Sequence, residues 1–422
     1  MAGERIATRG EGTRYVGRDT AQVPDIGMTR VDSEIYTSPE HWELERELIF
    51  RNTWFVVARS SEIADPGQFL VWEEFGETVV ISRMDDLSLA GFHNVCQHRG
   101  ARIVDPLRVT LKNRTGRPHT PLAAVDASAE LGDRDDTGPV VGSCPAREFV
   151  CPWHGFRYGP DGMVTAVPER VDFDSEELEG LRAPQVAVRD LAGWVWINLS
   201  GAQADSLEDY LGPVILEEFA HHRMEDMICV DRREYVMPTN WKAVVDGFIE
   251  VYHVAETHRE TIGDRLACRN AYQQLLDKHS MYFIPSVAQL DRFLDEGDHI
   301  RDSISHYLVF PNSIFNCQST HIQAFQPVPI DAHTAKYNVY LLVQPGGDDE
   351  FIAEQQVRWE HFQNVAKEDL YAATQLGATM RSMGYTRNLM NAREVRIPHF
   401  LDVVKSYTEP GQQGILDGGL GR

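Results

Sequence analysis

The segment NVCQHRG at residues 94–100 and the segment CPWHGF at residues 151–156 decide the fold of this chain. Each segment supplies one cysteine and one histidine, at C-x-H spacing in the first and C-x-x-H spacing in the second, and a glycine follows each pair. Thiolates and imidazoles are ligands of zinc ions and of iron–sulfur clusters. Two such pairs on two short loops therefore predict one shared metal centre.

Cys96, His98, Cys151 and His154 form the ligand set of a Rieske [2Fe–2S] cluster, in which two histidines replace two cysteines on one iron and raise its reduction potential. The alternative is a structural zinc ion, which also takes two cysteines and two histidines. A zinc site usually has its cysteines on one loop and its histidines on another, whereas each loop here supplies one of each. The pattern thus favours a cluster that accepts electrons from a carrier and passes them on.

The composition is that of an acidic globular protein. The chain has 422 residues, of which 42% are hydrophobic and 25% are charged, and its formal net charge is -24. This length predicts two domains, and the negative charge disfavours nucleic acid and anionic lipid as partners. No apolar run is long enough to span a membrane, the first residues lack the hydrophobic core of a secretory signal, and the six cysteines show no disulfide pattern. We therefore expect a cytoplasmic protein without a membrane partner.

The pattern of apolar, polar and turn residues changes along the chain. Residues 1–53 read as an N-terminal arm followed by a helix that Ser38 caps, and we expect them to pack on the C-terminal domain. Residues 54–200 read as a small all-β domain that holds the cluster, with a long insertion at residues 105–149 that is rich in glycine, proline and charge. Residues 201–422 alternate helical and β patterns without an internal repeat, which predicts a separate second domain.

A second candidate site lies in residues 240–258, which we place on a buried helix whose apolar stripe includes Phe248 and Tyr252. Asp246, Glu250 and His253 form another stripe on this helix, at i, i+4 and i+7 spacing. Buried acids and imidazoles need partners, which a metal ion and a hydrogen-bond relay would supply. His258 follows five residues after His253, so both can bind one metal only if the helix loosens or ends between them. The alternative is a pair of ordinary polar residues at a helix end.

A third ligand is expected on a helix over residues 361–381. Its apolar stripe includes Phe362 and Leu376, and Asp369 falls midway between them. Charged residues are rarely buried without a partner, and two histidines with one carboxylate are the ligands of non-haem Fe(II) oxygenases, which leave positions open for O₂. Glu368 is expected to point to another face of the helix, and Asp369 could instead be a salt-bridge or capping residue.

With both patterns in view, the chain resembles the large (α) subunits of Rieske-type non-haem iron oxygenases, the aromatic-ring-hydroxylating dioxygenase superfamily. The resemblance runs from about Trp54 to the C-terminus, and the NWK motif leading to E-x-x-H-x4-H is a second specific match beside the cluster loops. By that resemblance, His253, His258 and Asp369 bind a mononuclear Fe(II). Glu250 takes the position of the acidic bridge between a cluster histidine and that iron.

The resemblance also implies an architecture and partners. The fold is expected to be α+β, with a small all-β Rieske domain and a catalytic domain whose curved antiparallel sheet is flanked by helices (helix-grip type). A homotrimer is implied, with or without a small β subunit, in which the cluster of one subunit feeds the iron of its neighbour across Glu250. Electrons would come from NAD(P)H through a ferredoxin or flavin reductase. Asp246 is a candidate second catalytic acid or, alternatively, a structural hydrogen-bond partner.

Three features depart from the family pattern. The loop between the two cluster segments is longer than usual, Gly247 stands where many ring dioxygenases carry asparagine, and Glu250 replaces the commoner aspartate. The long loop affects the expected docking geometry of the electron carrier, and the other two departures weaken the transfer of a substrate from the ring dioxygenases.

The main hypothesis is therefore hydroxylation or dihydroxylation of an aromatic or polycyclic substrate with O₂. The alternative is a monooxygenase that performs O- or N-demethylation or side-chain hydroxylation with the same site residues. His321 and Gln323 are candidate contacts for a polar substituent of a small organic substrate. A simple electron carrier or an iron-binding structural protein is disfavoured, because residues 201–422 exceed what a carrier needs.

Overall fold

The computed structural model describes residues 5–7, 13–15, 30–106, 139–144, 148–296, 299–346, 349–391 and 393–409. The chain divides into two compact units, a smaller one of Val56–Asp205 and a larger one of Met1–Phe55 together with Ser206–Arg422. No helix in the described ranges has the length and apolar character needed to cross a membrane.

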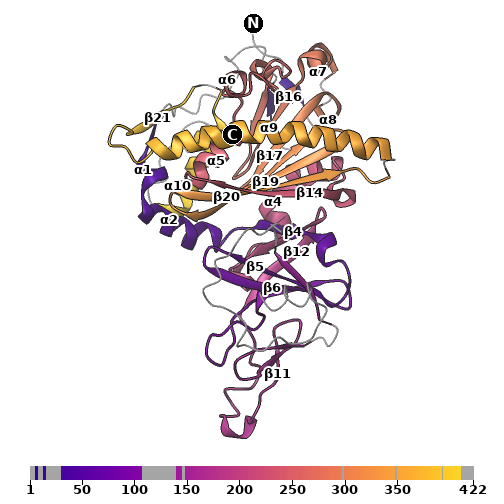
Figure 1. Ribbon diagram of the computed structural model, residues 1–422, viewed down its shortest axis with the longest axis vertical. Coiled ribbons are helices and arrows are strands. Elements are labelled where there is room, and N and C mark those ends of the chain that lie inside the picture. Colours follow the sequence, from indigo (N-terminus) through magenta and orange to yellow (C-terminus); the bar gives the residue numbers. More distant parts are fainter. Residues whose placement is uncertain are drawn as a thin grey trace. The chain divides into compact units, whose positions relative to one another are not determined.

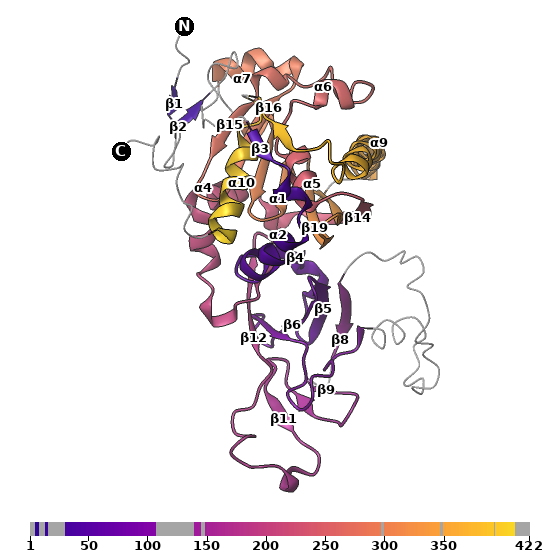
Figure 2. The same cartoon turned by 90° about the vertical axis from the view of Figure 1, so that its left-hand side faces the viewer.

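The smaller unit is built on a seven-stranded sheet with the order β4-β13-β12-β7-β6-β5-β8, and its neighbouring strands from β13 to β8 pair antiparallel. Figure 2 shows β5, β6 and β8 side by side. The strands are β4 (Phe55–Arg59), β5 (Gln68–Glu74), β6 (Glu77–Arg83), β7 (Leu89–His93), β8 (Val140–Ser143), β12 (Gln185–Leu191) and β13 (Trp194–Asn198).

A three-stranded sheet with the order β11-β10-β9 carries the second cysteine–histidine loop. Cys151 and His154 lie between β9 (Phe149–Val150) and β10 (Arg157–Tyr158), and β11 (Val164–Ala166) completes the sheet. Cys96 and His98 follow β7, so the two loops come from two different sheets. A shared apolar core buries Cys96 and Cys151.

The insertion expected at residues 105–149 lies largely outside the described residues, because 107–138 and 145–147 are not described. Its described end forms β8, which pairs with β5 at the edge of the seven-stranded sheet.

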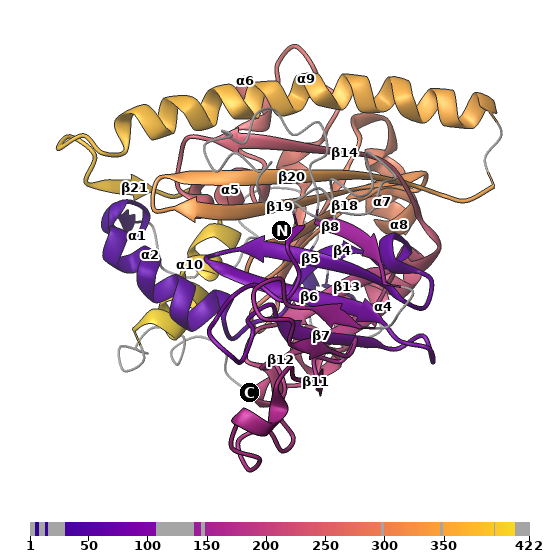
Figure 3. The same cartoon turned by 60° about the horizontal axis from the view of Figure 1, so that its bottom comes forward.

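The larger unit is centred on a curled, seven-stranded antiparallel sheet with the order β14-β20-β19-β18-β17-β16-β15. The long helix α9 (Asp349–Thr379) contacts β14, and it runs alongside β14 and β20 in Figures 1 and 3. The strands are β14 (Ile228–Met237), β15 (Tyr272–Leu275), β16 (Ser280–Pro285), β17 (Ser303–Val309), β18 (Ser313–Cys317), β19 (His321–Asp331) and β20 (Thr334–Val343). These elements give the mixed helix and strand architecture that the sequence predicts.

The larger unit also contains a short strand pair and several further helices. They are β3 (Arg30–Asp32), which pairs with β21 (Arg387–Leu389), and the helices α1 (Glu34–Thr37), α2 (Pro39–Glu45), α4 (Leu207–His221), α7 (Leu290–Glu296), α8 (His299–Asp302) and α10 (Arg396–Thr408).

The N-terminal helix α2 is tied to the rest of the larger unit by a buried ion pair. Ser38 caps α2, since its hydroxyl accepts a hydrogen bond from the backbone N–H of His41 at 3.2 Å. Glu45, at the end of α2, is fully buried, and its Oε1 lies 2.5 Å from Nζ of the equally buried Lys242. The indole of Trp241 donates to the second oxygen of Glu45 at 2.8 Å.

The single helix that we predicted over residues 240–258 is wrong, because the chain breaks it into α5 (Trp241–Phe248) and α6 (Val254–Thr257). The carboxylate of Glu250 accepts from the backbone N–H groups of Tyr252 and His253, and such side-chain bonds compete with helical ones. Tyr252, expected on the buried stripe, is consequently 56% exposed.

Candidate metal centres

The two cysteine–histidine loops close with the same backbone bond. The N–H of Gly100 donates to the carbonyl of Cys96 at 2.8 Å, and the N–H of Gly155 donates to the carbonyl of Cys151 at 3.1 Å. Both glycines have positive φ, 75° and 78°, a conformation that residues with a Cβ rarely adopt. This explains why a glycine follows each pair in the sequence.

The loops bring the four predicted side chains together. Cys96 and Cys151 are buried, and the ring centroids of His98 and His154 lie 4.5 Å apart. Nδ1 of His98 is buried and has no hydrogen-bond partner among the described residues, and burial lowers the pKa of this histidine. A metal ligand of this kind is a neutral imidazole whose binding nitrogen has no other partner, so the residues fit a bound cluster.

The geometry also bears on the zinc alternative. A tetrahedral ion gathers all its ligand atoms around one point. Among the described residues, however, the group of three or more metal-binding side chains whose ligand atoms lie within 4.8 Å of one another is His253, His258 and Asp369. The cysteine–histidine ligands are not grouped this tightly, as expected for a cluster in which the four ligands are shared between two irons.

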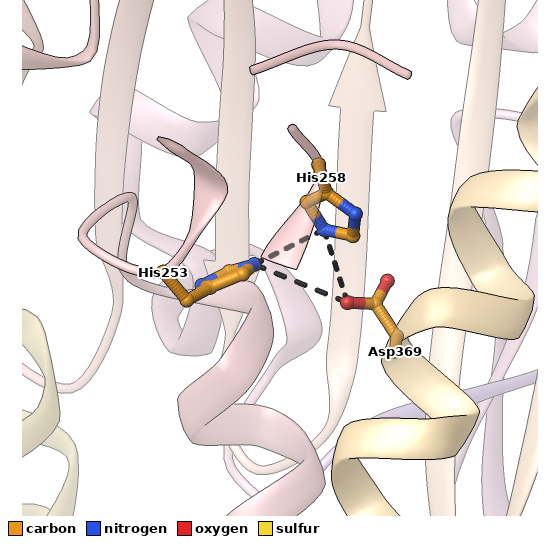
Figure 4. A group of neighbouring side chains, drawn as sticks. All are labelled: His253, His258 and Asp369. Carbon is orange, nitrogen blue, oxygen red and sulfur yellow. Dashed lines mark hydrogen bonds and ion pairs between the residues drawn. The ribbon is translucent and has the colours of Figure 1, made fainter. Parts of the chain in front are cut away.

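The second centre lies between α6 and α9. His253 directly precedes α6, His258 directly follows it, and Asp369 projects from α9, as Figure 4 shows. Nε2 of His258 lies 3.3 Å from Nε2 of His253 and 3.1 Å from Oδ1 of Asp369, and the third side of the triangle measures 3.9 Å. Two imidazoles and a carboxylate at these separations fit the ligand set of a non-haem Fe(II) ion.

Each histidine of the triad is oriented by a carboxylate other than that of Asp369. Nδ1 of His253 is hydrogen-bonded to Glu250, and Nδ1 of His258 lies 2.7 Å from Oε2 of Glu368. Because a carboxylate only accepts, each Nδ1 carries the hydrogen, and each Nε2 presents a lone pair towards the other members of the triad. The sequence placed Glu368 on another face of the helix from Asp369 and did not predict this contact with His258.

The electrostatics of the triad follow from these contacts. Burial lowers the pKa of His253, but its hydrogen bond to Glu250 and the charges of Glu250 and Asp369 outweigh burial, so the net shift is upward. The pKa of His258 is also raised, because Asp369 and Glu368 outweigh its burial. Both imidazoles therefore sit in a negative environment, which stabilises a cation placed between them.

Asp246 is not among the residues that line the cavity containing all three triad members. It borders a second cavity of about 320 Å³, which His253 and Asp369 also line. The hydroxyl of Tyr36 donates to Oδ2 of Asp246 at 2.6 Å, and burial raises the pKa of this carboxyl to about 8. Glu250 lines both cavities, as do His253 and Asp369.

The triad lines a cavity of about 540 Å³. The rings of Phe248, Phe325 and Phe362 form part of its wall, and adjacent rings lie 5.1 Å and 5.5 Å apart. His321 and Gln323, which the sequence offered as contacts for a polar substituent, also line it.

The two units correspond to two known domain families. Residues 53–177 match the Rieske [2Fe-2S] domain, and residues 224–409 match the ring hydroxylating alpha subunit (catalytic domain). The pair defines an enzyme that combines an electron-transfer domain with an oxygenase domain.

Two relatives match most of the chain. The carnitine monooxygenase oxygenase subunit of Acinetobacter pittii (strain PHEA-2) is 24% identical over 86% of this chain and 88% of its own length. The large oxygenase component of the naphthalene 1,2-dioxygenase system of Pseudomonas aeruginosa is 26% identical over 76% of this chain and 72% of its own length.

The fold agrees with these relatives. A quaternary ammonium Rieske monooxygenase in complex with L-carnitine superimposes with a TM-score of 0.70 at 22% identity, covering 90% of this chain and 96% of the other. The naphthalene 1,2-dioxygenase of Rhodococcus sp. gives a TM-score of 0.68 at 19% identity over 91% and 95% of the two chains.

The chain therefore belongs to the Rieske oxygenases and is a large, oxygenase subunit of that family. Its two domains imply a Rieske cluster and a mononuclear iron, and the family implies that electrons arrive from a partner while O₂ and a small molecule react.

Proposed function

We propose that Cys96, His98, Cys151 and His154 hold the [2Fe–2S] cluster and that His253, His258 and Asp369 hold the iron. The matching closure of the two loops and the unpartnered Nδ1 of His98 support the first assignment. The convergence of three ligand atoms within 4.8 Å supports the second.

The reaction is a reductive activation of O₂ next to a bound organic substrate. The two iron centres, when bound, supply single-electron transfer and the coordination of O₂. Glu250 and Glu368 keep the histidines in the tautomer that leaves Nε2 free to bind a metal. The apolar wall excludes water and holds the substrate beside the triad.

The substrate that the geometry favours is aromatic or polycyclic, hydroxylated or dihydroxylated in the cavity of about 540 Å³. The observation that carries this proposal is that one cavity contains the whole triad and a wall of three phenylalanine rings. Flat rings pack well against such a wall.

A second candidate is a monooxygenase that removes an N- or O-methyl group or hydroxylates a side chain. The specific observation in its favour is coverage, since the carnitine monooxygenase subunit of Acinetobacter pittii matches 86% of this chain against 76% for the naphthalene enzyme of Pseudomonas aeruginosa. The quaternary ammonium group of L-carnitine would need an acidic partner in this cavity. The acids among its described lining residues are Glu250 and Asp369, and both already face histidines of the triad.

The remaining partners follow from the family. We propose that NAD(P)H supplies the electrons through a ferredoxin or a flavin reductase, and that the subunits form a homotrimer, with or without a small β subunit. In this trimer Glu250 links His253 to His154 of the neighbouring subunit, while residues 54–200 receive the electrons and residues 201–422 perform the oxygenation.

The experiment uses purified protein, a surrogate reductase, NADH and ¹⁸O₂, with a panel of aromatic, methoxylated and quaternary ammonium compounds read by mass spectrometry. A diol with two labelled oxygens supports dihydroxylation, whereas a phenol released with formaldehyde supports demethylation. Asp369→Ala should abolish all products and leave the spectrum of the reduced cluster unchanged. The matched control is Glu360→Ala, at an exposed position of the same helix, which should retain turnover. Turnover that survives Asp369→Ala would refute the iron site.

A further inference from the structure

A row of polar side chains crosses the sheet beneath the cavity. Tyr282 on β16 lies opposite His306 on β17, His306 lies opposite Asn316 on β18, and Asn316 lies opposite Gln323 on β19. All four residues line the cavity that contains the triad. Directly paired residues share a face of a sheet, so these four side chains form one continuous polar row.

A buried positive charge lies behind this row. Arg396, the first residue of α10, is fully buried, and its guanidinium donates to Oγ and to the carbonyl oxygen of Ser280 at 2.9 Å and 3.0 Å. The guanidinium carbon lies 4.5 Å from the centre of the Tyr282 ring. No carboxylate of the described residues forms an ion pair with it. Burial lowers the pKa of Arg396 to about 9, so the group remains a cation at neutral pH.

Arg396 sets the tautomer of His306. Its Nη1 lies 3.5 Å from Nδ1 of His306, and because a guanidinium has only donors, Nδ1 accepts and Nε2 carries the hydrogen. Burial and the charge of Arg396 hold the pKa of His306 well below its usual range, so the ring is neutral. Its Nε2 is buried and without a hydrogen-bond partner in the described part of the chain. The Nε2–H group of His306 is thus a hydrogen-bond donor without an acceptor among the described residues, and the charge of Arg396 polarises it.

The amide of Asn316 also has a buried atom without a hydrogen-bond partner. This atom is Oδ1, which is unpartnered among the described residues. Because the two ends of an amide can exchange places, its NH₂ group can turn towards an acceptor that His306 also contacts. Two neighbouring groups on the row are therefore able to donate to one ligand.

The charges around the cavity favour an anion. The acids among its described lining residues, Glu250 and Asp369, are engaged with the triad histidines. The lining cations Arg265 and Arg358 are both exposed, and neither forms an ion pair with a described residue. Two cations therefore face the cavity and a third, Arg396, lies behind the row, while no acid among the described lining residues is left to receive a cationic group.

We propose that the substrate is a carboxylate, whose oxygens accept hydrogen bonds from Nε2 of His306 and the amide of Asn316 while its apolar body extends along the phenylalanine wall towards the triad. Arg396 acts as a positioning residue, because it touches His306 rather than the substrate. The inference rests on the proposed function, which makes this cavity the substrate site. It deepens that function by naming an organic acid as the substrate class.

The test compares binding of an acid with binding of its neutral amide. Anaerobic titration calorimetry of the holoenzyme would measure 6-methoxy-2-naphthoate against 6-methoxy-2-naphthamide, so that affinity is read without turnover. A hydrogen bond to a charged group is worth about 1.5–3 kcal/mol, so we expect the acid to bind at least about tenfold more tightly. This comparison needs no variant and is independent of any folding defect.

Variants then locate the preference. His306→Phe should abolish the difference between acid and amide, whereas His306→Gln, which keeps a donor, should retain part of it. Ile304→Val, which changes an apolar lining residue two positions away on β17, should alter both affinities equally. Arg396→Lys keeps the buried charge but loses the branched guanidinium that contacts both Ser280 and His306. This variant should reduce the preference for the acid.

Two results would overturn the inference. One is equal affinity of the wild-type protein for the acid and the amide. The other is a His306→Phe variant that weakens both ligands equally, as expected if a water shared by His306 and Asn316 occupies the row. If the amide is oxidised without any acid preference, only this inference fails. If the acid is preferred in binding but neither compound is oxidised by the reduced enzyme, the proposed function fails instead.

Discussion

Replacing Lys242 by methionine is expected to destabilise the larger unit by about 3–4 kcal/mol at pH 7. The change leaves the carboxylate of Glu45 fully buried, with the indole of Trp241 at 2.8 Å as its remaining donor from this cluster. Breaking a buried ion pair in this way costs about 3–5 kcal/mol. The loss has a ceiling, because a buried glutamate can take up a proton, which at pH 7 costs an ordinary glutamate about 3.7 kcal/mol.

That ceiling makes the penalty dependent on pH. In the variant the carboxyl is harder to ionise in the folded state than in the unfolded state, so the penalty grows as pH rises above about 4.3. It should fall by about 1.4 kcal/mol per pH unit on acidification, to about 1 kcal/mol at pH 5. The double variant Glu45→Gln with Lys242→Met removes both charges and should lie within about 1 kcal/mol of the wild type.

The assay must report on the larger unit alone, because a protein with two compact units need not unfold in one step. Urea unfolding that is monitored by hydrogen exchange of peptides covering α5 reports on this unit alone. A loss below about 1 kcal/mol at pH 7, a loss that does not shrink by pH 5, or a double variant as unstable as the single one would each refute the reasoning.

Three further predictions rest on contacts in the two centres and at the nearby Asp246. Glu368→Gln should weaken Fe(II) binding about 10–100-fold in a chelator competition without changing the cluster spectrum, because His258 loses the carboxylate at its Nδ1; unchanged affinity would contradict that role. Asp246→Asn should remove a decline in unfolding free energy between pH 4 and pH 8. That decline, at most about 1.4 kcal/mol per pH unit, arises because the folded carboxyl, whose pKa burial raises to about 8, keeps a proton that the unfolded one has lost; identical pH profiles would refute it. Tyr158→Phe should lower the cluster potential by tens of millivolts in a redox titration, since its hydroxyl donates to Sγ of Cys96 at 3.2 Å; an unchanged or higher potential would count against this cluster assignment.

The parts of the protein that the sequence predicts well are those fixed by neighbouring residues. The two cysteine–histidine loops depend on a few consecutive positions and on Gly100 and Gly155, whose backbone conformations only glycine adopts readily. The start of α2 depends on Ser38 and the proline after it. Local chemistry of this kind is visible without any knowledge of the tertiary structure.

Faces of helices are less predictable, because helical periodicity assumes that the helix continues. The stripe that contained Tyr252 was drawn through a break, since α5 ends at Phe248 and Glu250 binds the backbone that follows. The polar row under the cavity was equally hidden. His306 and Gln323 belong to different strands, and only the sheet register brings them into line through Asn316.

The failure at Glu368 shows what helix periodicity leaves out. Neighbouring residues on a helix point about 100° apart, so helical periodicity alone places Glu368 outside a site built on Asp369. An imidazole, however, has two nitrogens that face different directions, and His258 turns Nε2 towards Asp369 and Nδ1 towards Glu368. Two adjacent acids on one helix can therefore serve one histidine, the first by orienting it and the second by sharing its metal. A pair of neighbouring acids opposite a predicted histidine ligand is accordingly a stronger signal of a metal site than either acid alone.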